Sequence, residues 1–166
     1  MKLIINVLLF FNLILCINSC GFSPSLANNN SSARKYLEDI EIEVPSTIKG
    51  VIFYDHLKNI LPFKATEAKY LLKIKLVFSE APSFVMGDNS DILRKTKHLI
   101  TYYTLLDNKT GKVITNGNFL KIASYSTTFS PYSNTINETA AMENLANVAA
   151  EEVKSRLSLF FIHNNK

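Results

Sequence analysis

The first nineteen residues constrain this chain most, because they decide which part of it is left to fold. Lys2 supplies a short positive start, residues 3–15 form a largely apolar run, and small or polar residues then lead to Cys20. This order is that of a secretory signal peptide. The apolar run is interrupted by two asparagines, and it is shorter than the roughly 20 apolar residues that a transmembrane helix needs. We therefore expect residues 1–19 to be removed during export.

The site of cleavage is indicated by residues 17–20, Ile-Asn-Ser-Cys. They resemble the bacterial lipobox, in which a small residue precedes a cysteine that is acylated before cleavage. Asn18 departs from the small or aliphatic residue that is usual at its position, and Cys16 fits less well because the bulky Leu15 precedes it. The alternative is an ordinary signal peptide, with Cys20 as an incidental thiol.

Acylation would explain the presence of Cys20. After cleavage the chain would hold a single cysteine, so no internal disulfide could form even in an oxidising compartment. Two acyl chains already hold a protein stably at a membrane. Gly21 follows the cysteine, and in enteric bacteria a residue other than aspartate at this position favours sorting to the outer membrane. We therefore expect an outer-membrane lipoprotein that is anchored through Cys20 and faces the periplasm.

The remaining residues are enough for one domain. Residues 20–35 are rich in Asn and Ser and lack periodicity, which is typical of a lipid anchor followed by a flexible tether. We expect residues 36–162 to form a single domain and residues 163–166 a polar tail.

Alternating and three-to-four-residue spacings of apolar side chains predict the elements of this domain. In chain order they are a strand at 38–44, a helix at 46–61, strands at 70–78, 97–106 and 112–125, and a helix at 134–161. Ser46 is the expected N-cap of the first helix, although Gly50 weakens it and residues 51–54 would also suit a strand. Gly111 can take a positive φ in the last hairpin. The order β-α-β-β-β-α predicts an α+β fold, a four-stranded mostly antiparallel sheet with two helices packed on one face.

Motifs for catalysis or metal binding are missing from the sequence. The chain has no His-Glu-x-x-His pair, no Gly-x-Ser-x-Gly turn and no glycine-rich phosphate loop, and His56, His98 and His163 are dispersed. The formal charge of +4 falls to +3 once Lys2 is removed (4 − 1), and the basic residues are scattered. We therefore expect no enzyme, no cofactor, no metal site and no nucleic-acid partner.

Several short motifs follow one another in a characteristic order from Cys20 almost to the end of the chain. They are Cys20-Gly21-Phe22 followed by Pro24, Arg94 at the end of a polar loop, Tyr102 with Leu105, the turn at 107–112, Ser124-Tyr125, Ser130-Pro131-Tyr132, and an alanine-rich helix ending in residues 156–161. Together they resemble the LptE family of lipopolysaccharide-assembly lipoproteins, in its alphaproteobacterial form. Ser25 and Leu26 depart from the Leu-Tyr-Gly-like continuation common in that family.

The resemblance implies a non-enzymatic function. LptE proteins sit inside the large outer-membrane β-barrel LptD, plug it, help it fold and assist delivery of lipopolysaccharide to the outer leaflet. The expected partners are therefore an LptD-like barrel, lipopolysaccharide and outer-membrane lipid. The alternative function is that of an auxiliary outer-membrane lipoprotein of another envelope complex, such as a lipid-export transporter subunit or an activator of a peptidoglycan synthase.

Basic residues gather where the polar loop at 81–95 enters the next strand. Arg94, Lys95 and Lys97 form the densest basic cluster of the mature chain, with Lys121 on the following strand as a candidate neighbour. Because arginine can bind a phosphate through two parallel hydrogen bonds and lysine adds a point charge, these four residues are candidate lipopolysaccharide-binding side chains. The simpler alternative is a set of solvated surface charges.

We expect Cys20→Ala to leave the precursor uncut and unacylated, because lipoprotein processing follows formation of a thioether at this sulfur. Mass spectrometry of the N-terminus of the mature protein tests this. An unmodified mature peptide that begins elsewhere, for instance at Gly21, would contradict the lipid anchor.

Overall fold

The computed structural model describes residues 32–62, 68–81 and 93–164. Its elements are, in chain order, α2 (Ser32–Glu38), β1 (Ile40–Glu43), α3 (Ile48–Ile60), β2 (Tyr70–Glu80), β3 (Leu93–Asp107), β4 (Val113–Thr127) and α4 (Pro131–Asn164). Cys20, the predicted signal peptide and most of the polar loop lie outside these residues.

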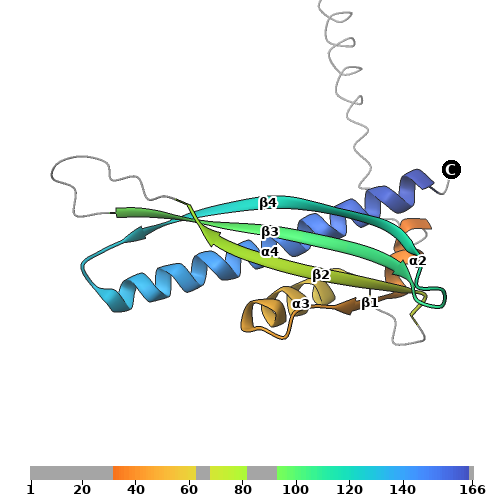
Figure 1. Cartoon of the computed structure of the whole chain (residues 1–166), viewed down its shortest axis with the longest axis horizontal. Helices are drawn as coiled ribbons and strands as arrows, with labels where there is room; N and C mark the ends of the chain where they lie inside the picture. Colours follow the sequence, from red (N-terminus) through yellow and green to blue (C-terminus); the bar gives the residue numbers. More distant parts are fainter. Residues whose placement is uncertain (1–31, 63–67, 82–92, 165–166) are drawn as a thin grey trace, which may run out of the picture. The chain divides into compact units, whose positions relative to one another are not determined.

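The strands form one sheet in the order β1-β2-β3-β4. β1 pairs with β2 in parallel, across the connection through α3, and the pairs β2–β3 and β3–β4 are antiparallel. The helix α4 runs along β3 and β4, and α2 and α3 contact α4 (Figure 1). The predicted α+β class, with a four-stranded mostly antiparallel sheet, is confirmed.

One helix was not predicted. The short helix α2 begins at Ser32, so residues 32–35 of the predicted tether are helical. Ala33 and Leu37, four residues apart, are both buried at 1% exposure, and this single apolar stripe holds the turn against α4. Such a short stripe beside an Asn/Ser-rich run gives little periodic signal.

The first turn of α3 explains a glycine that weakened its prediction. The N-cap is Thr47 rather than Ser46, and its hydroxyl accepts a hydrogen bond from the backbone N–H of Gly50 at 3.1 Å. A Cβ at Gly50 would lie 2.1 Å from the carbonyl oxygen of Pro45. Glycine is therefore needed here, because the chain leaving β1 passes directly over the helix.

The boundaries of other elements shift by a few residues. β3 begins at Leu93 instead of residue 97, and α4 begins at Pro131 and takes in residues 163–164 of the predicted tail. Pro131 suits the first position of a helix because its missing N–H has no partner there. In the β3–β4 hairpin, Gly111 has the expected positive φ of 69°.

α4 buries a stripe of residues at four-residue steps. Leu145, Ala149, Val153 and Leu157 are at most 2% exposed, as their spacing predicted. The stripe ends on Phe161, not on Phe160 as expected from the sequence. No helix among the described residues is long and apolar enough to cross a membrane.

Phe161 closes the end of the core at which the chain leaves α2. Its ring stacks on that of Tyr36 with centroids 5.1 Å apart, and the ring of Tyr70 on β2 lies 5.6 Å away. This aromatic cluster joins α2, β2 and the end of α4.

Toward the other end of α4, a buried lysine joins the helix to the sheet. Lys97 on β3 is 7% exposed. Its ammonium donates to the carboxylates of Glu80, at the end of β2, and of Glu138 on α4, the latter at 2.7 Å. Burial alone would lower the pKa of Lys97, but the hydrogen bonds to Glu138 and Glu80 outweigh it, and the pKa lies above its ordinary value. One cation therefore holds three elements together.

We expect Lys97→Ala to lower the free energy of unfolding by about 1 to 3 kcal/mol, because two carboxylates lose a charged donor. Arg94→Ala, three residues away on the exposed side, is the matched control and should cost little. Thermal melting of both variants measures the difference, and equal melting temperatures would contradict the structural role of Lys97.

The same comparison has a defined pH dependence. The Lys97 hydrogen bond lowers the pKa of Glu80 below its ordinary 4.5, so this contribution is present above pH 4.5 and is lost as the pH falls through the folded-state value. The raised pKa of Lys97 makes its contribution present below about pH 10.5. The difference in the free energy of unfolding between wild type and Lys97→Ala should therefore be largest between these two pH values. It should decrease in acid.

Candidate functional site: the uncovered face of the sheet

The helices leave one face of the sheet uncovered. On β3, Leu99, Thr101 and Tyr103 lie under the helices and are at most 8% exposed. Their neighbours point the other way, because successive side chains of a strand alternate between faces. Tyr102, in the centre of this outer face, is 42% exposed.

An apolar row crosses the outer face at right angles to the strands. Val77 on β2 is opposite Ile100 on β3, and Ile100 is opposite Leu120 on β4. Directly opposite side chains in a sheet are in contact distance. Ile122, two residues along β4 from Leu120, lies beside this row and is 57% exposed. We call these four residues the apolar row.

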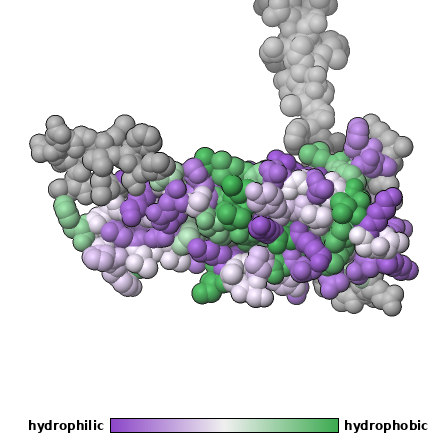
Figure 2. Space-filling view, viewed as in Figure 1, coloured by the Kyte–Doolittle hydropathy of each residue, from purple (hydrophilic) through white to green (hydrophobic). Residues whose placement is uncertain are grey.

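Hydrophobic side chains reach the surface between hydrophilic ones over the strands (Figure 2). Exposed apolar residues scattered singly are ordinary, but residues adjoining across three strands form a continuous patch. The patch is open to a ligand or partner.

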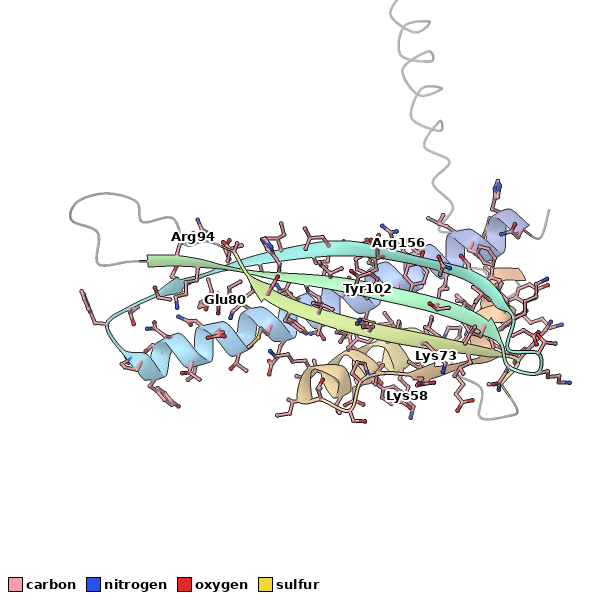
Figure 3. The ribbon with its side chains drawn as sticks, viewed as in Figure 1. Lys58, Lys73, Glu80, Arg94, Tyr102 and Arg156 are labelled. Atoms are coloured by element: carbon pink, nitrogen blue, oxygen red, sulfur yellow. The ribbon has the colours of Figure 1, made fainter. Side chains whose placement is uncertain are left out.

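Cations flank the apolar row on both sides. The ammonium of Lys75 lies 5.8 Å from the ring centroid of Tyr102, one cross-strand row away. Lys73 lies further along β2 and pairs with Glu43 at 3.1 Å. Arg94 is exposed on the opposite side of the row, toward the other end of the sheet (Figure 3).

Negative and positive side chains occupy different parts of this face. Glu41 and Glu43 lie on it at the β1 edge. On the outward positions of β2, β3 and β4 that the structure describes, there are lysines and an arginine but no carboxylate. The face therefore offers apolar contact between positive charges, which suits an anionic amphiphile.

The four basic residues expected to bind ligand do not form one surface. Only Arg94 points outward, whereas Lys95 and Lys97 share the side of the sheet that the helices cover. Lys121 is on that side too, where its ammonium pairs with Glu152 of α4 at 2.9 Å. The sequence did not indicate that these residues face opposite sides of the sheet. The strand β3 was expected to begin at residue 97, so Arg94 and Lys95 were assigned to the preceding loop.

Lys121 and its partners fasten β4 to α4. Glu152 also accepts from Arg156 at 2.7 Å, and the hydrogen bonds from Lys121 and Arg156 hold the pKa of Glu152 below its ordinary value. The guanidinium of Arg156 lies 4.9 Å from the ring centroid of Phe119. These side chains are therefore engaged in joining helix to sheet.

Residue spacing did not reveal the apolar row. Val77, Ile100 and Leu120 come from three different strands, and only the register brings them together. The sequence contains one sign of the row. At the alternate, solvent-facing positions of this strand, Lys73 and Lys75 are followed by the apolar Val77.

The described residues offer no obvious place for a metal ion. In this part of the chain, no three His, Cys, Asp or Glu side chains lie close enough together to hold one.

Comparison with known proteins gives one clear relative in sequence and several in structure. No protein-family model matches the chain. The uncharacterized protein RP188 of Rickettsia prowazekii is 38% identical over 154 residues, which cover 92% of this chain and 96% of that protein.

Three crystal structures of bacterial proteins share the fold. A candidate lipoprotein of Caulobacter crescentus matches with a TM-score of 0.63 and 19% identity, over 78% of this chain and 96% of that one. A minor lipoprotein of Acinetobacter baumannii matches at 0.53 and 14%, over 74% and 92%. The rare lipoprotein B of Shewanella oneidensis matches at 0.53 and 9%, over 77% and 98%.

At identities this low, the three structures establish likeness of fold alone. The sequence relative reaches further, because its identity extends over nearly the whole of both chains. This protein therefore belongs to the same family as RP188 of Rickettsia prowazekii.

Proposed function

We propose that this protein is an LptE-like outer-membrane lipoprotein that partners and plugs an LptD-like β-barrel and assists assembly of lipopolysaccharide at the cell surface. In this proposal Cys20 carries the lipid anchor. The observation that carries the proposal is the uncovered face of the sheet, where the apolar row lies between cations that no carboxylate on β2 to β4 neutralises.

The chemistry of lipopolysaccharide suits this face. It is an amphiphile with acyl chains and phosphates, so it needs apolar contact beside positive charge. Lys75 is one row away from Val77, roughly 7 Å along the strand, and Arg94 is six residues from Ile100, roughly 20 Å. The guanidinium can bind a phosphate through two parallel hydrogen bonds, and the lysine adds a point charge.

Of the residues expected from sequence, Arg94 keeps its proposed role. Lys97 and Lys121 are engaged in ion pairs with α4, and Lys95 lies on their side of the sheet. The proposed ligand-binding cations are therefore Arg94 and Lys75.

Two further features support a barrel plug. α4 has 34 residues, which makes it about 50 Å long at 1.5 Å per residue. A bilayer with its headgroups is about 40–45 Å thick, so the domain is long enough to fill a barrel from one side to the other. The fold is also shared with three bacterial proteins described as lipoproteins.

The barrel partnership is tested by affinity purification. The full-length tagged protein, extracted in mild detergent, should co-purify with an outer-membrane β-barrel, identified by mass spectrometry. Recovery with an inner-membrane transporter or a cell-wall synthase instead would contradict the proposal and favour the auxiliary-lipoprotein alternative.

Lipopolysaccharide contact is tested by removing the two outward cations. We expect Lys75→Ser with Arg94→Ser to weaken lipopolysaccharide binding about tenfold at low salt, equivalent to about 1.4 kcal/mol. The difference should shrink as salt rises, because exposed charges are screened. Barrel co-purification should survive.

The matched control is Lys109→Ser with Lys112→Ser. It removes the same charge from exposed positions at the β3–β4 hairpin, away from the apolar row. If both double variants melt like wild type and bind lipopolysaccharide equally well, the outer face is not the binding site.

A further inference from the structure

The turn between β4 and α4 is an exposed tip that carries aromatic side chains and no charge. Phe129 is 82% exposed, Tyr132 76% and Ile136 49%. From residue 122 to residue 137 the sequence contains no charged residue. We call residues 128–136 the tip.

Hydrogen bonds in and beside the tip satisfy several of its backbone groups. The side-chain amide of Asn134 accepts from the N–H of Thr128 at 2.7 Å and donates to the carbonyl of Thr128 at 2.8 Å. The hydroxyl of Ser130 accepts from the N–H of Ser133 at 3.4 Å. The Asn137 amide donates to the carbonyl of Ser126 at 3.0 Å.

These hydrogen bonds lower the free-energy cost of transferring the tip out of water. Burial of a polar group is costly mainly when the group loses its hydrogen-bond partner. Here the turn supplies its own partners through uncharged side chains, and the aromatic rings are left pointing away from the core. These hydrogen bonds therefore reduce the cost of moving the tip into a less polar environment.

An exposed cation lies at the base of the tip. Arg94 on β3 is opposite Ser126, the second last residue of β4. Its side chain is exposed and has no ion-pair partner among the described residues. Aromatic side chains backed by arginine or lysine are typical of segments that sit at a membrane–water interface, where the cation meets lipid phosphates.

We infer that the tip inserts into the interfacial layer of a phospholipid bilayer with anionic headgroups, with Phe129 and Tyr132 as the inserting side chains and Arg94 as the headgroup contact. The inference goes beyond the proposed function, which does not require the tip to touch lipid. The two are compatible because α4, about 50 Å long, exceeds the bilayer thickness of about 40–45 Å, so a domain that plugs a barrel can extend its tip past the barrel rim to the surrounding lipid.

The size of the tip favours a bilayer over a protein partner. An aromatic side chain buries roughly 150–250 Å², so Phe129 and Tyr132 together offer roughly 300–500 Å², which is less than the roughly 800 Å² that each side of a stable protein interface buries. A bilayer needs no complementary surface. The tip also lies at the end of α4 opposite to α2, about 50 Å away along the helix, so lipid contact here would be separate from attachment through the N-terminal segment.

The experiment uses a fluorophore that the protein lacks. The chain contains no tryptophan, so Phe129→Trp introduces a single one at the tip. Ile48→Trp at the start of α3 is the matched control, because Ile48 has the same exposed fraction of 82%. Both full-length variants are reconstituted into phosphatidylethanolamine vesicles containing phosphatidylglycerol, after their melting temperatures have been compared with wild type.

We expect the emission of Phe129→Trp to shift to shorter wavelength in these vesicles and to be quenched by lipids with brominated acyl chains. The control should keep a solvent-like emission and little quenching. Adding Arg94→Ser to Phe129→Trp should reduce the quenching in anionic vesicles at low salt, and the reduction should disappear in neutral phosphatidylcholine vesicles.

Three results would overturn the inference. They are equal emission and quenching at the two positions, a shift that appears only when lipopolysaccharide is added, and a shift that appears only with a co-purified barrel protein. The last two would assign the tip to lipopolysaccharide or to a protein partner. None depends on the barrel pull-down, so failure of the inference is distinguishable from failure of the proposed function.

Discussion

The contact between α4 and one face of the sheet is the interaction on which the rest of the structure depends. Ala146, Ala149 and Ala150 on α4 are fully buried, and their small side chains let neighbouring elements lie close to this long helix. Leu145, Val153 and Leu157 add larger buried apolar side chains to the same helix. The other two helices follow from this contact, since α2 and α3 are both held against α4.

The residues of the sheet that the helices cover determine which side chains the other face presents to solvent. Because strand side chains alternate, each apolar residue that α4 covers on β3 is flanked by residues that it cannot reach. The apolar row and its flanking cations are therefore set out by the same register that builds the core. The register of the sheet keeps the row continuous, which suits a ligand or partner that lies along it.

The ion pairs between the sheet and α4 show how charge is divided between the two faces. Lys97 and Lys121 lie under α4, and each meets a glutamate of that helix. A buried ammonium without such a partner would be too costly to keep. The glutamates thus hold these lysines in structural roles, while Arg94 remains on the solvent side and is available both to the apolar row and to the tip.

The sequence by itself determined the α+β class, the order of most elements, the buried stripe of α4 through Leu145, Val153 and Leu157, and the turn at Gly111. These follow from local spacing and from the φ that glycine permits, which any stretch of chain carries within it. Tertiary structure alone decided the role of α2, the fate of the basic cluster and the existence of the apolar row. A lysine at the end of a strand has the same local sequence whether it faces water or a helix, and residues such as Val77 and Leu120 become neighbours only when the strands pair in register.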